Sequence, residues 1–151
     1  MSERKAAAPA ADRARLRAEA EALVDARARE IEQLAGRAAR NFGDREKSQI
    51  NQLERLGYQA VSLAELEFHV KRQAGKDTKG KNWCKDGFAQ ALIEFIRGLE
   101  RDLQPLMDRA PEDVRLRLPA VVAGRAMRHL FSAYLFALAQ KGNARSDGGG
   151  S

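Results

Sequence analysis

The spacing of apolar residues between positions 88 and 103 is the strongest constraint on the fold. These residues recur every three or four positions and share one face, about a quarter of the helical circle: Phe88, Leu92, Phe95, Ile96, Leu99 and Leu103. Apolar residues recur at helical spacing elsewhere in the chain too. No segment alternates apolar and polar residues as a half-buried strand does, and no Asn-Gly turn or internal repeat is present. The sequence therefore predicts an all-α fold, a bundle of about five helices.

Turn and capping residues predict where these helices begin and end. We expect a long first helix from Asp12 to about Asn41, a second from Asp44 to about Gly57, and a third opened by a capping box of Ser62 and Glu65 and ending near Gly75. The fourth runs from about Asp86 to Leu103. Pro105 and Pro111 bracket a turn region, a short helix covers 111–118, and Pro119 opens a last helix reaching Gln140.

The chain is predicted to hold a single domain. Its 151 residues suffice for a hydrophobic core without metal or disulfide support. Residues 1–11 are expected to form a disordered lead-in, residues 12–141 one helical domain, and residues 142–151 a flexible tail. The lone cysteine, Cys84, excludes an internal disulfide and fits a reducing compartment. Because no apolar run approaches signal-peptide or membrane-spanning length, a cytoplasmic protein without membrane contact is expected.

Positive charge is concentrated in the connection between the third and fourth expected helices. The window 71–85 carries six Lys or Arg and one Asp, whereas the whole chain has a net charge of +6. The basic side chains are Lys71, Arg72, Lys76, Lys79, Lys81 and Lys85. Such a cluster is typical of contacts with a phosphate backbone, although lysine-rich loops are also common as solvated connections. Lysine contacts neutralise phosphates and rarely read base edges, so little sequence preference is expected.

Trp83 lies inside this basic window, and two interpretations of it stay open. Its ring could stack on a nucleic-acid base, or it could pack as an apolar staple that fixes the entry into the fourth helix. A tryptophan in a small domain usually serves the core, which favours packing.

The last helix carries a second charge signal. Six basic residues and no acidic one lie between Val114 and Ser146. Arg125 and Arg128 fall opposite a core face formed by Met127, Leu130, Phe131, Tyr134, Leu135 and Leu138, and are further candidates for nucleic-acid contact. Phe136 shares the charged side and is a candidate contact with a protein partner.

The residues of enzyme chemistry are few. His69 and His129 lack the spacing and the company of cysteines and carboxylates that a zinc site needs. Gly75 and Gly80 do not have the spacing of a phosphate-binding loop, and Cys84 has no histidine partner nearby in sequence. We expect a non-enzyme without metal, cofactor or small-molecule substrate.

The segment KSQINQLERLGYQAVSLAELEFHVKRQAGKDTKGKNW resembles the small subunit of type III CRISPR effector complexes. The similarity lies in a Ser-Gln-Ile helix start at Ser48, Gln49 and Ile50, then a basic helix end with Arg72, Gln73 and Lys76, then Trp83. The amphipathic GFAQALIEFIRGL and the aromatic-rich HLFSAYLFALAQKG are also similar, so residues 46–99 and 125–142 are covered. The long Ala/Arg-rich first helix, the KDTKGK insertion and Asn51, where the family often has arginine, depart from the pattern.

The resemblance implies a non-catalytic subunit of an RNA-guided antiviral ribonucleoprotein. Such a subunit is present in several copies, binds the backbone of guide and target RNA without reading sequence, and contacts neighbouring subunits. Two other functions remain open on the residues alone. One is a helical adaptor that binds an acidic protein and no nucleic acid. The other is a helix-turn-helix regulator of DNA, against which Glu65 and Glu67 in the would-be recognition helix count.

Overall fold

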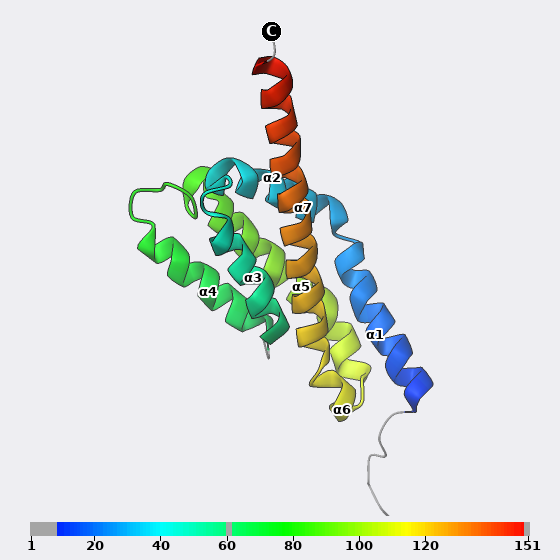
Figure 1. The fold of residues 1–151 in the computed structure, drawn as a ribbon. Coiled ribbons are helices and arrows are strands. Elements are labelled where there is room, and N and C mark those ends of the chain that lie inside the picture. Colours follow the sequence, from blue (N-terminus) through cyan, green and yellow to red (C-terminus); the bar gives the residue numbers. More distant parts are fainter. Residues whose placement is uncertain (1–8, 60–61, 150–151) are drawn as a thin grey trace, which may run out of the picture.

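A computed structural model describes the backbone of residues 9–59 and 62–149, and side chains as far as residue 143. All regular secondary structure in these residues is helical (Figure 1). The helices are α1 (Ala10–Asp25), α2 (Ala28–Phe42), α3 (Lys47–Gln59), α4 (Leu63–Lys76), α5 (Phe88–Arg109), α6 (Glu112–Arg115) and α7 (Leu118–Gly149), with a 3₁₀ turn, η1, at Lys85–Gly87. The all-α prediction is confirmed, but the described residues form six long helices and the four-residue α6 rather than about five helices.

Helix α7 is the centre of the bundle and lies against α1, α2 and α3 (Figure 1). Its buried face includes Val122, Ala126, Met127 and Leu130. The hydroxyl of Tyr134 donates a hydrogen bond to the carbonyl oxygen of Gly43, and burial raises the pKa of Tyr134 to about 12. This aromatic side chain therefore ties α7 to the end of α2.

A second layer is formed by α4 and α5, which pack side by side. Every apolar residue that defines the predicted face of α5, from Phe88 to Leu103, is buried, and so are Leu63, Leu66 and Val70 of α4. The helical spacing thus identified both core faces correctly, because burial of one apolar stripe supplies most of the stability of such helices.

The expected first helix is divided in two by a break at Ala26 and Arg27. Arg27 leaves helical geometry, with φ −105° and ψ 20°. Its guanidinium donates to Asp102 of α5 at 2.8 Å and to Glu30 at 2.7 Å. No proline or glycine marks this position. The bend is stabilised by contacts with α5 that local sequence does not reveal.

Two of the three predicted helix caps are wrong. Pro9, and not Asp12, is the N-cap residue of α1, and Asp12 lies in its first turn. α3 begins at Lys47, so Asp44 does not directly precede it; its carboxylate instead lies 3.7 Å from the ammonium group of Lys47. Ser62 is the N-cap residue of α4 as predicted, but its side chain makes no capping hydrogen bond. The capping sequence therefore predicts correctly where α4 begins, although Ser62 does not form the expected side-chain hydrogen bond.

The chain around Pro105 and the two ends also differ from expectation. Pro105 lies inside α5, which continues to Arg109 because Leu106 is buried beyond it. α7 continues past Gln140 to Gly149, and its C-terminal end projects beyond the other helices (Figure 1). Helix α1 already begins at Ala10, while the rest of the lead-in lies outside the described residues.

The periodicity of the last helix predicts that Leu135 lies on its core face, but this side chain is 40% exposed. Among the residues whose structure is described, no helix combines the length and the apolar character needed to cross a membrane.

Candidate nucleic-acid interface

Five of the six basic side chains predicted in the window 71–85 are exposed and make no ion pair within the described chain. Together we call them the basic loop surface: Arg72 and Lys76 on the last turns of α4, Lys79 and Lys81 in the connection, and Lys85 in η1. The surface therefore begins on a helix and continues through the connection to α5, so its charges are held by one continuous stretch of backbone.

Asp77, the one acidic residue of the window, folds this connection. Its carboxylate accepts hydrogen bonds from the backbone N–H groups of Lys81 (2.9 Å), Asn82 (3.1 Å) and Cys84 (2.9 Å). These bonds, led by that from Cys84, lower the pKa of Asp77 despite the opposing effect of burial. The carboxylate is thus used internally, and it orders the backbone that carries Lys79 and Lys81.

A second clamp comes from α2. The side-chain amide of Asn41 donates to the carbonyl oxygens of Asn82 (3.0 Å) and Lys85 (2.7 Å). Gly80 and Asp86 adopt positive φ values of 60° and 53°, which allow sharp turns before Lys81 and after Lys85. The connection is therefore tied to the bundle at two points in the free protein.

Trp83 is in the core, with 2% of its surface exposed. Its ring meets Phe42 edge-on at 5.0 Å between centroids and lies 5.9 Å from Phe88. Its backbone carbonyl accepts from the N–H of Ala89 at 2.7 Å, inside the first turn of α5. Trp83 therefore packs in the core, as the packing interpretation predicts. The alternative, stacking on a nucleic-acid base, is wrong, because no face of the ring is accessible.

Lys71 differs from the other five basic residues of the window. Its ammonium group lies 2.8 Å from the carboxylate of Glu67 and 5.7 Å from the ring centroid of Phe68. The carboxylate of Glu67 also accepts hydrogen bonds from Nε and Nη2 of Arg97, at 3.0 and 3.1 Å. The hydrogen bonds from Arg97, followed by that from Lys71, lower the pKa of Glu67. Lys71 belongs to a structural ion-pair group that joins α4 to α5.

The two candidates on α7 have different environments. Arg125 makes hydrogen bonds of 2.9 and 3.0 Å to both oxygens of Asp25 and lies 3.4 Å from Glu21. Its positive charge is therefore compensated by α1, which argues against the predicted phosphate contact. Arg128 is exposed and has no ion-pair partner among the described side chains. Only Arg128 remains free for a ligand.

His69 lies beneath the basic loop surface. Its ring is 6.3 Å from that of Trp83, and its Nε2 is buried without a hydrogen-bond partner. Burial, followed by the positive charges of Arg72 and Lys76, lowers the pKa of His69. Burial and the two nearby cations thus favour the neutral form of this imidazole.

Sequence reasoning identified the basic residues but missed the two that arrange them, Asp77 and Asn41. An aspartate followed by Thr-Lys-Gly is a turn signal that was available in the sequence. The contact of Asn41 spans about forty residues of chain and left no local signal. In the described part of the chain, no group of three or more histidine, cysteine or carboxylate side chains has the arrangement of a metal site.

The comparisons with known proteins give no identity. No protein-family model, no curated protein and no solved structure matches this chain.

Proposed function

We propose that this chain is a non-catalytic, RNA-binding small subunit of an RNA-guided ribonucleoprotein. The observation that carries the proposal is the basic loop surface, whose five exposed cations have no carboxylate partner in the described chain. Asp77, the one carboxylate in the window, is turned inward onto backbone N–H groups. The surface therefore offers positive charge to a phosphate backbone without competition from its own acidic residue.

The order of the loop also favours binding. A lysine-rich loop held by Asp77, Asn41 and Trp83 loses less conformational entropy on binding than an unstructured one. Because four of the five cations are lysines, they neutralise phosphates without a fixed geometry toward base edges. Binding of guide and target RNA without sequence readout, as the family resemblance implies, is consistent with this composition.

Contacts with other subunits have support on α7. Phe136 is 65% exposed, beside an open groove lined by Glu32, Ser132, Ala133, Phe136, Ala137 and Gln140. The projecting end of α7 is accessible to a neighbouring molecule (Figure 1). An exposed aromatic at such a groove is typical of a protein contact, and in an assembly it would meet another subunit or another copy of this chain.

The RNA contact is tested by fluorescence anisotropy with a labelled single-stranded RNA over a range of salt concentrations. Each neutralised phosphate adds about 0.7 to the log–log salt slope, so removing four cations lowers the slope by up to about 2.8. The test variant replaces Lys76, Lys79, Lys81 and Lys85 by Ala. The control removes four exposed cations elsewhere, at Arg15, Arg29, Arg101 and Lys141. Equal affinity of the test variant and the native protein contradicts the proposal.

Assembly is tested by gentle purification from the native host and sequencing of the nucleic acid that is recovered. Short RNAs with a shared repeat-derived end, together with several other proteins, support the ribonucleoprotein. Recovery of a single protein partner without RNA instead supports the helical adaptor, with Phe136 as the first residue to test.

A further inference from the structure

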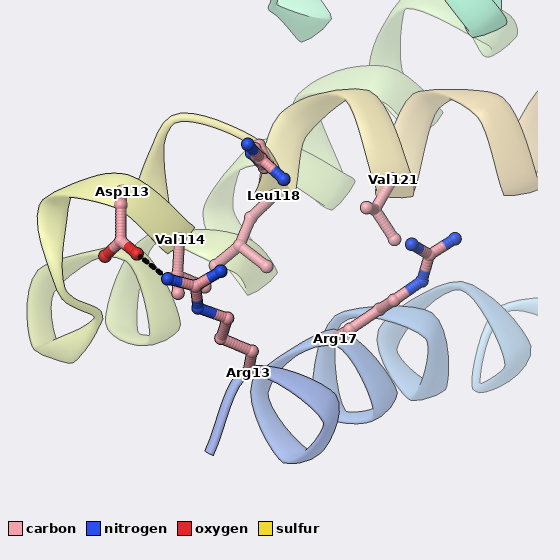
Figure 2. A pocket seen from close by; sticks show the side chains of 7 residues that line it. Arg13, Arg17, Asp113, Val114, Leu118 and Val121 are labelled. Carbon is pink, nitrogen blue, oxygen red and sulfur yellow. Dashed lines mark hydrogen bonds and ion pairs between the residues drawn. The ribbon is translucent and has the colours of Figure 1, made fainter. Parts of the chain in front are cut away.

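A second group of arginines lies where α1, α6 and the start of α7 meet, at the end of the bundle remote from the α4–α5 connection (Figure 1). There the three elements line a half-open hollow of about 120 Å³. Val114, Leu118 and Val121 form its apolar wall, while Arg13 and Arg17 reach toward it from α1 (Figure 2).

The charges around this hollow do not balance. Its lining contains the three cations Arg13, Arg17 and Arg117 and the single carboxylate of Asp113. Asp113 is engaged by Arg13 at 2.9 Å. Arg117 has no ion-pair partner in the described chain.

The remaining cation, Arg17, has only a weak partner. It lies 4.0 Å from Glu21, a carboxylate that also lies 3.4 Å from Arg125. The side chain of Arg17 is 66% exposed and that of Arg117 is exposed as well, so the lining of the hollow presents two accessible cations with little compensation from carboxylates.

The size and the chemistry of the hollow define the anion. The hollow is partly open to solvent and has room for an anion of a few heavy atoms. Guanidinium groups bind oxyanions through paired N–H donors. A tetrahedral phosphate presents acceptors in several directions and can meet donors from α1 and α7 at once, whereas a planar carboxylate offers two oxygens in one plane.

We infer that the hollow between α1, α6 and α7 is a phosphate-binding site, in which Arg17 and Arg117 hold the anion and Asp113 positions Arg13 at its edge. The site is separate from the basic loop surface and does not depend on the proposed RNA contact. Its phosphate can come from free phosphate or a phosphomonoester, or from the backbone of an RNA.

The site is tested by methyl NMR of the full chain during titration with inorganic phosphate. We expect saturable shifts of the Val114, Leu118 and Val121 methyl groups, and no such shifts with sodium chloride at equal ionic strength. Substituting Arg17→Ala together with Arg117→Ala weakens phosphate binding about tenfold or more, since hydrogen bonds to charged groups are the strong ones. Arg15→Ala with Arg29→Ala removes the same charge from exposed positions outside the hollow and leaves the binding unchanged.

Absence of methyl shifts in the native protein, or equal weakening in both double variants, overturns the site. The native titration decides the question even if a variant does not fold. If single-stranded RNA competes with inorganic phosphate in this titration, the natural ligand is a phosphate of the RNA backbone. If phosphate binds and RNA does not compete, the natural ligand is a free phosphate or a phosphomonoester. If the loop variant at Lys76, Lys79, Lys81 and Lys85 binds RNA normally while the methyl shifts persist, the proposed function fails and the phosphate site stands.

Discussion

The indole Nε1 of Trp83 donates a hydrogen bond of 2.6 Å to Oε1 of Gln49. This bond joins the connection before α5 to the start of α3, and it satisfies the polar atom of a ring that is otherwise buried in the core. The lysines on either side of Trp83, Lys81 and Lys85, are exposed. The residue that anchors the connection and the residues available to a ligand thus lie next to each other in the sequence with opposite environments.

Trp83→Ala is expected to lower the free energy of unfolding by about 3–5 kcal/mol, the usual cost of removing a large buried aromatic side chain. Trp83→Phe keeps most of the apolar contacts and loses the bond to Gln49, so its cost is smaller. Urea unfolding followed by circular dichroism measures both. An unfolding free energy of Trp83→Ala within about 1 kcal/mol of the native value, well short of the usual cost, contradicts the core assignment.

Gly57 is expected to reject any side chain. A Cβ there would lie 2.8 Å from the carbonyl oxygen of Ala123 and 3.0 Å from the Cβ of Met127, so α3 and α7 must separate to admit it. Gly57→Ala is therefore destabilising although alanine favours helices. Gly75→Ala is the matched control: it lies in α4, where an added Cβ meets nothing within 4 Å, and should stabilise by about 0.5–1 kcal/mol. Thermal unfolding of the two variants should give shifts of opposite sign.

The sequence was sufficient to predict the helical faces but not the contacts between helices. The face from Phe88 to Leu103 was predictable because helical periodicity is a local property that burial then uses. The break at Arg27 was not, since the contact that stabilises it is with Asp102, on another helix. Pro105 also misled the prediction: proline is disfavoured inside a helix, yet α5 continues past it to Arg109, with Leu106 buried in the core.

For the candidate interface, the charges could be predicted from the sequence but their partners could not. The charge of Lys76, Lys79 and Lys81 was readable directly, because a window with six basic residues and a single acidic one leaves a compositional signal. The sequence did not show which arginines form ion pairs. Arg125 and Arg128 lie three residues apart on α7, and the pairing of Arg125 with Asp25 of α1 depends on how α1 packs against α7.

Asp77→Asn is expected to loosen the basic connection at neutral pH, because it removes the ionised carboxylate that accepts the backbone hydrogen bonds. Backbone N–H donors hold the folded-state pKa of Asp77 below its ordinary value of 3.8. The stabilisation is therefore fully present above pH 3.8 and is lost as the pH falls through the lower folded-state pKa. Asp77→Asn should speed tryptic cleavage after Lys79 and Lys81 at neutral pH. Asp86→Asn, which changes an exposed carboxylate of the same connection, should not. Equal cleavage rates in the two variants would show that Asp77 does not order the loop.

The pair of Arg125 and Asp25 is expected to contribute to stability and not to RNA binding. Because both side chains are partly exposed, the coupling energy in a double-mutant cycle with alanine should be about 0.5–1 kcal/mol. Arg128→Ala has no ion pair to lose among the described residues and should leave the free energy of unfolding unchanged. A larger loss of RNA affinity in Arg125→Ala than in Arg128→Ala would return Arg125 to the candidate interface.

His69 should report RNA binding without touching the RNA. The positive charges of Arg72 and Lys76 contribute to its lowered pKa, so phosphates that neutralise those charges should raise the pKa of His69. NMR titration of the imidazole with and without single-stranded RNA measures the shift. His129 is the internal comparison, because burial and then Arg125 lower its pKa, with a smaller effect from Arg128. A rise at His69 alone places the phosphates at the basic loop surface, a rise at both adds Arg128, and an unchanged His69 in RNA-saturated protein removes Arg72 and Lys76 from the interface.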